Sequence, residues 1–128
     1  MKREGTAASI GEALWKAFAV EDWSTAADLL HEDYVQEWPQ SGERIVGRAD
    51  ALEVNRNFPG GLPKMTFRRT TGDEQLAVIE TELRYADGST YLGVSVIEAR
   101  DGKIVKETDY FAQPFRAPEW RAGWVQRF

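Results

Sequence analysis

Two carboxylates near the end of the chain, Glu107 and Asp109, have a spacing that suggests proton chemistry. They follow an Asp-Gly pair at 101–102, which is typical of a tight turn that leads into a β-strand. Residues two apart on a strand lie on the same face, so both acids share a face with the apolar Val105 and Phe111. A face that begins and ends with apolar residues borders either water or a pocket that uses an acid or a base.

A close pair of carboxyl groups changes how readily each of them holds a proton. The two charges repel each other, which raises the pKa of one member, and burial raises it further. A carboxyl group whose pKa is raised in this way can serve as a general acid or base. Asp109 would move the proton, and Glu107 would tune the pKa of Asp109. The alternative is structural: Asp109 would bond backbone amides, pair with an arginine or remain solvated.

Aromatic and amide side chains could surround a ligand beside these acids. In the short extended stretch Tyr34–Trp38, the side chains of Tyr34, Gln36 and Trp38 share one face. Trp38 could form an aromatic wall and Gln36 an amide that orients a ligand, or Trp38 could belong to the core. Trp15 and Phe58 carry the same two alternatives.

The alternation around Glu82 leaves a second ambiguity. Glu82 stands on the charged face of an alternating segment, which usually means that it faces solvent. In the functional alternative, Glu82 or Tyr91 is a hydrogen-bonding partner in the pocket.

Composition and motifs exclude several classes of function. The chain has 128 residues, a net charge of −5 and no cysteine, which excludes disulfides and thiolate chemistry and disfavours nucleic-acid binding. The single histidine, His31, gives no metal-ligand spacing, and no Gly-x-Ser-x-Gly motif is present. We expect no cofactor, because moving a proton next to a carbonyl needs only an adjusted base and a hydrogen-bond donor.

The location of the protein is predicted from the same features. No apolar run approaches the length of a membrane span, and no apolar core follows the charged start Met1–Gly5, so a signal peptide is not expected. The sequence favours a cytoplasmic protein with no membrane partner.

The elements that would position these residues fall into two groups. Helical spacing predicts a helix over Thr6–Val20, a second that starts near Asp22 and a third over Gly47–Phe58. Period-two alternation then predicts four strands, joined by Gly- and Asp-containing turns: Met65–Gly72, Gln75–Ala86, Thr90–Arg100 and Lys103–Gln113.

This order predicts an α+β fold in a single domain over residues 1–128, with three N-terminal helices on one face of an antiparallel sheet. A strongly curved sheet around helices leaves a conical hollow suited to a small molecule. The tail Pro114–Phe128 contains Trp120 and Trp124, so we expect it to pack against the domain.

The order of elements and several motifs resemble the nuclear transport factor 2-like superfamily, and more narrowly its SnoaL-like, polyketide cyclase-like branch. The resemblance is carried by the segments His31–Gly42, Gly47–Ala51, Asp101–Val105, Tyr110–Phe111 and Pro114–Arg121. It implies a cone-shaped fold, a pocket between the first helices and the sheet that takes a small apolar molecule, and a homodimer formed through the sheet.

The resemblance also bears on activity. In SnoaL-like cyclases an acid/base Asp lies at the position that matches Asp109, with a His where this chain has Glu107. Ketosteroid isomerases of the superfamily place their base near the position of Trp38, which cannot remove a proton. A limonene-type epoxide hydrolase needs an Asp–Arg–Asp set, of which Asp109 and Arg84 offer a fragment.

The expected function is therefore a cyclase- or isomerase-type proton transfer on an apolar carbonyl ligand. The alternative is a non-catalytic ligand-binding or dimerisation module.

Overall fold

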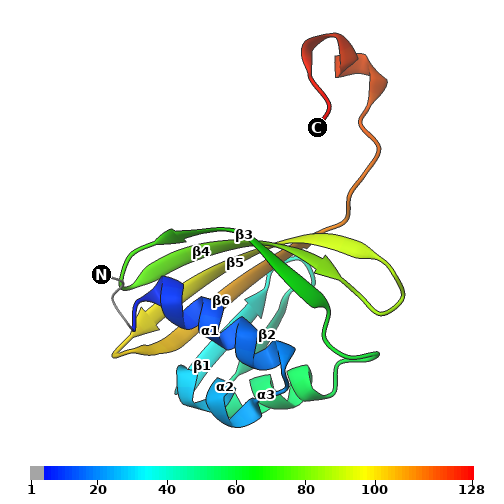
Figure 1. The fold of residues 1–128 in the computed structure, drawn as a ribbon. Coiled ribbons are helices and arrows are strands. Elements are labelled where there is room, and N and C mark those ends of the chain that lie inside the picture. Colours follow the sequence, from blue (N-terminus) through cyan, green and yellow to red (C-terminus); the bar gives the residue numbers. More distant parts are fainter. Residues whose placement is uncertain (1–4) are drawn as a thin grey trace.

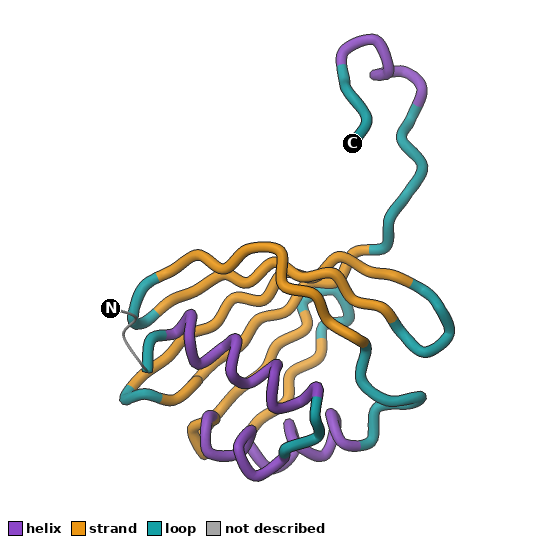
Figure 2. Tube along the Cα trace, in the orientation of Figure 1, coloured by secondary structure: helices purple, strands orange, loops and turns teal. Residues whose placement is uncertain are grey.

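Three helices lie against one face of a curved six-stranded sheet in the computed structural model, which describes residues 5–128 (Figure 1). The strands follow the order β2-β1-β6-β5-β4-β3. Their bounds are β1 Leu30–Trp38, β2 Glu43–Val46, β3 Lys64–Gly72, β4 Leu76–Arg84, β5 Thr90–Arg100 and β6 Lys103–Ala112. This is the expected α+β cone, with the helices on the concave side only (Figure 2).

The helices begin where side chains can accept from the first free backbone N–H groups. Helix α1 (Ala7–Ala19) is capped by Thr6, which accepts from Ser9 N at 3.1 Å. Helix α2 (Trp23–Leu29) is capped as predicted by Asp22. Helix α3 spans Arg48–Arg56.

Helix α1 approaches the sheet closely because Gly11 has no side chain. A Cβ atom built there would lie 2.8 Å from Ile79 Cδ1 of β4. The apolar stripe Ile10, Leu14 and Phe18 is buried against the sheet, as the helical spacing predicts. The space beyond Leu14 toward the C-terminal end of α1 stays open and becomes the cavity described below.

The sheet is mixed, which corrects the expectation of an antiparallel one. β1 runs parallel to β6, with Gln36 opposite Glu107, and it begins four residues before the predicted Tyr34. β2 was not predicted; it pairs antiparallel with β1 across the turn that contains Gly42. The pairing of β1 with β6 joins residues about 70 positions apart, and no local pattern in the sequence specifies it.

The predicted face of β6 also needs one correction. Between β5 and β6 the register shifts at Glu98/Ala99, so Val105 is an extra residue in β6. Ile104 therefore takes the buried position below Glu107 on the concave face, and Val105 does not share that face. The alternation of Glu107, Asp109 and Phe111 beyond the bulge is as predicted.

The C-terminal segment 113–128 does not pack against the domain, contrary to expectation. It leaves the end of β6, runs away from the helices and ends in a short 3₁₀ helix, η1 (Glu119–Trp124) (Figure 1). The side chains of Trp120 and Trp124 are 74 % and 83 % exposed. We call residues 113–128 the arm.

The start of the chain, on which the expectation about a signal peptide depends, falls largely outside the described residues, which begin at Gly5. Within residues 5–128, none of the helices has the length and apolar character needed to cross a membrane.

Candidate functional site

A cavity of about 720 Å³ lies between the concave face of the sheet, the end of α1 and the segment after α3. Most of its wall is apolar or aromatic. From the predicted set, the residues that line it are Trp15, Gln36, Trp38, Phe58, Tyr91, Asp109 and Phe111. A cavity of this size fits a small cyclic molecule of drug-like dimensions.

Asp109 lies in the wall of this cavity and is only 1 % exposed. Gln36 of β1 donates to its Oδ2 at 2.6 Å, and Ser95 of β5 donates to its Oδ1 at 2.6 Å. The parallel pairing of β1 with β6 and the antiparallel pairing of β5 with β6 bring these donors to either side of Asp109. The carboxyl group is therefore fixed in one orientation.

Glu107 lies next to Asp109 on the same face but does not line the cavity. It is 1 % exposed, and burial raises its pKa well above the usual range, with the charge of Asp109 raising it further. A hydrogen bond from Tyr34, itself buried behind the cavity, lowers the pKa of Glu107 only in part. The burial and the nearby acids raise the pKa of Tyr34 well above 10, so Tyr34 stays a neutral donor.

Burial also raises the pKa of Asp109, but its hydrogen bonds oppose this effect. Donation from Glu107, Ser95 and Gln36 lowers the pKa of Asp109. Hydrogen bonds thus favour the ionised form of Asp109, whereas burial and the charge of Asp109 favour the protonated form of Glu107, which is the member of the pair that donates toward Asp109. Asp109 is then a base in a mostly apolar cavity.

Two indole N–H groups in the cavity wall have no acceptor. Among the described residues, the buried polar side-chain atoms without a partner are Trp15 Nε1, Trp38 Nε1 and Glu107 Oε1. Trp38 Nε1 makes no hydrogen bond of normal geometry, although the indole lies close enough to Asp109 to lower its pKa slightly. An unpaired buried donor is costly, so each indole N–H would be stabilised by an acceptor.

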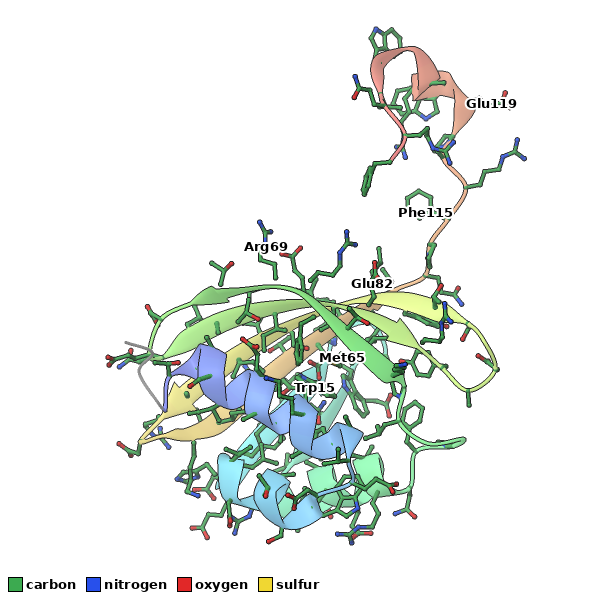
Figure 3. All side chains as sticks on the ribbon, in the orientation of Figure 1. Trp15, Met65, Arg69, Glu82, Phe115 and Glu119 are labelled. Atoms are coloured by element: carbon green, nitrogen blue, oxygen red, sulfur yellow. The ribbon has the colours of Figure 1, made fainter. Side chains whose placement is uncertain are left out.

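The structure separates the predicted site residues into three groups. Seven line the cavity, and Glu107 and Tyr34 lie buried beside it. Glu82 lies on the outer face, where it pairs with Arg68 at 3.5 Å, so it is not part of the cavity (Figure 3). Trp15 points from α1 toward the sheet in the same view.

Gln36 has a different part from the one predicted, because its amide N–H groups point at the two acids and not at a ligand carbonyl. Ser95 was missed. It lies on the same face of β5 as the buried Gly93 and Ile97, and only the register with β6 places it opposite Asp109. Gln40 was missed too: its side-chain amide bonds both the N–H and the C=O of Phe111 at the cavity wall.

The Asp–Arg–Asp fragment considered for an epoxide hydrolase is not assembled. Arg84 alternates with the buried Leu83 and lies exposed on the outer face of β4. It contributes to a separate groove there and not to the cavity that holds Asp109.

A curved sheet that wraps α1 and encloses a cavity at the wide end defines the nuclear transport factor 2-like class of fold. Residues 12–107 match the SnoaL-like domain, and the chain belongs to that family. The match ends at Glu107, two residues before Asp109. No curated protein matches the chain.

Solved structures of similar proteins cover nearly the whole chain. An NTF-2 like protein of unknown function from Burkholderia xenovorans LB400 is 38 % identical, with a TM-score of 0.82 and coverage of 93 % of this chain and 92 % of that one. A "putative ketosteroid isomerase" from Kribbella flavida DSM 17836 is 30 % identical, with a TM-score of 0.87 and coverage of 95 % and 89 %. An epoxide hydrolase of M. tuberculosis, described as LEH-like, is 26 % identical, with a TM-score of 0.71 and coverage of 82 % and 81 %.

Proposed function

We propose that the protein is a cofactor-independent enzyme that moves a proton on a small apolar carbonyl compound bound in the cavity. The observation that carries the proposal is the pair of acids: Asp109 lies in the wall of a largely apolar cavity of about 720 Å³, backed by the buried Glu107, and burial raises the pKa of both. A base held in an apolar site is a stronger base than one in water, because its charged form is poorly solvated.

The chemistry follows from which groups are already bonded. Asp109 takes a proton from the carbon next to the carbonyl, and the charge that develops on the carbonyl oxygen needs donors. The amide of Gln36 already bonds the acids, so the free indole N–H groups of Trp38 and Trp15 are the donors available to that oxygen. Asp109 then returns the proton to the same or another carbon, which exchanges or isomerises the substrate.

The description of one solved relative supports this class of reaction. The "putative ketosteroid isomerase" at 30 % identity carries a description that also involves proton transfer beside a carbonyl. This chain has Trp38 in the region where isomerases of the superfamily place their base, so we assign the base to Asp109 on the opposite strand and not to β1.

The alternative is a binding module that catalyses nothing. It is favoured by the full set of partners around Asp109, because a carboxylate that accepts from Gln36, Ser95 and Glu107 could simply hold three strands together. In that case the cavity would bind an apolar ligand, and Asp109 would matter only for stability.

Deuterium exchange separates the two possibilities without knowledge of the natural substrate. We would incubate 2-tetralone and similar cyclic ketones with the protein in D₂O and follow loss of the α-proton signals by NMR. We expect catalysed exchange that falls by about 100-fold or more in Asp109→Asn, the usual contribution of a general base.

The matched control is Asp101→Asn, which makes the same chemical change at the exposed turn before β6. Asp101 has φ 54°, a conformation that Asn adopts readily, so this variant should keep both fold and exchange rate. Equal rates for Asp109→Asn and the unaltered protein, with both folded, would refute the assignment of the base.

A further inference from the structure

The arm leaves several large apolar side chains largely exposed to water and away from its own domain (Figure 1). Of its residues, the exposed apolar ones are Phe115, Trp120, Trp124, Val125 and Phe128. The interactions within η1 are small: Arg121 lies over the ring of Trp120 at 5.9 Å, and Arg116 approaches Glu119 at 3.6 Å. A cluster of exposed aromatic residues of this kind marks a surface that binds another molecule.

The path of the arm is fixed where it leaves the sheet. Gln113 Nε2 donates to the hydroxyl of Tyr91 at 2.8 Å, which holds the first residue of the arm against β5. Pro114 and Pro118 then restrict the backbone, and Pro118 has an extended conformation with φ −65° and ψ 142°. A short, proline-bounded link holds η1 away from its own sheet (Figure 1).

The outer face of the same sheet carries an apolar band that no helix of the described residues covers. Its centre is β5, where Val94 lies opposite Tyr110 of β6 and Val96 opposite Val78 of β4. Leu92, Val94 and Tyr110 are exposed by 36–45 %. We call the five residues Val78, Leu92, Val94, Val96 and Tyr110 the outer band.

The family resemblance already implies a homodimer formed through the sheet; we propose that in such a dimer, paired through the outer bands, the two arms are exchanged, so that η1 of each copy packs on the other. The arm leaves the sheet on the side opposite the helices, which is the side of the outer band (Figure 1). If two such faces meet about a two-fold axis, each arm must run alongside the partner's domain. The apolar side chains of both surfaces then leave water together.

Charge favours a second copy as the occupant. Residues 114–128 contain three arginines and one glutamate, a net charge of +2, whereas the whole chain carries −5; residues 1–113 therefore carry −7. An arm of one sign and a domain of the other attract each other between copies. The proposed exchange of arms rests on the exposed arm, the outer band and their charges, and it is independent of any role for Asp109.

The first test measures oligomeric state in the full chain. We expect sedimentation to give twice the 14.5 kDa mass of one chain, and the double variant Trp120→Ser/Trp124→Ser to weaken the dimer at least about tenfold. Val94→Glu, which adds an acid opposite Glu80, should also weaken it. The control Val20→Ser removes another exposed apolar side chain, at the end of α1, and should change nothing.

A chain that stays monomeric up to about 100 µM, a concentration at which specific dimers form, would overturn the proposal. So would a dimer that the double variant leaves unchanged, because the arm would then have no part in it.

The second test asks whether the arm crosses between copies. The chain has no cysteine, so Ala122→Cys can carry a single spin label on η1. Mixed with ¹⁵N-labelled, unmodified protein, the spin-labelled copy should broaden the amide signals of Leu92 and Val94 in the other chain. The same label at Val20→Cys should not. If the label on Ala122→Cys causes no broadening in a dimer, the proposed exchange of arms is overturned.

Discussion

Replacing Glu107 by glutamine tests the proton that the acid pair is inferred to share. Glu107 is protonated when buried, with a pKa raised well above 4.5, but it is ionised in the unfolded chain above about that pH. The folded state therefore binds one proton more than the unfolded state, and stability falls as the pH rises from about 4.5 toward the raised pKa. Glutamine cannot ionise, yet it can still donate to Asp109, so the variant removes the pH dependence and keeps the contact.

The size of the effect follows from counting that proton. One proton difference changes the free energy of unfolding by about 1.4 kcal/mol per pH unit. Between pH 4.5 and the raised pKa, a Glu107 that stays protonated lowers the stability of the native protein by that amount for each pH unit. The facing groups that contribute are Asp109 on β6 and Tyr34 on β1, and both remain in the variant.

Urea unfolding of both proteins at pH 5, 6 and 7 gives the comparison. The difference in free energy of unfolding, variant minus unaltered protein, should increase by about 1.4 kcal/mol for each pH unit. Parallel curves over this range would mean that Glu107 ionises normally in the folded protein. The shared proton, and with it the protonated partner of the proposed base, would then be wrong.

Two further substitutions test the cavity and the packing of the strands beside it. Trp38→Phe keeps the aromatic wall but removes the unpaired indole N–H. Because this donor acts on the charge that develops on the substrate oxygen, kcat for α-proton exchange should fall by about tenfold or more while KM changes little. A raised KM at constant kcat would contradict this role. Gly93→Ala should lower the free energy of unfolding by about 1–3 kcal/mol, since the added Cβ would lie 2.5 Å from Thr81 Oγ1 and 3.3 Å from Leu83 Cδ1; an unchanged urea midpoint would show that the strands adjust freely.

The sequence predicted the parts of the fold that depend on near neighbours. The cap at Asp22, the stripe of α1 and the hairpin turn at Asp101-Gly102 depend on residues a few positions apart, and each was placed correctly. Both turn residues there have positive φ, at 54° and 74°, as such hairpins require.

Long-range pairing could not be predicted in the same way. The parallel contact of β1 with β6 and the bulge at Val105 depend on the register between distant strands, and they decide that Gln36 and Ser95 bracket Asp109. The side on which Glu82 lies was left open, because alternation defines two faces without saying which is concave; the structure places it on the outer face and so excludes its alternative role as a ligand residue. The arm was expected to pack on its own domain because its aromatic residues imply burial, and the chain alone does not say against which copy.

The parallel pairing of β1 with β6 has a consequence for how the molecule folds. Strands β3 to β6 form consecutive hairpins whose partners are close in sequence, whereas Gln36 and Asp109 are 73 positions apart. Closing so long a loop is entropically costly and slow compared with forming a hairpin. We therefore expect this pairing to form after the hairpins, and until it forms both acids remain hydrated on an open sheet.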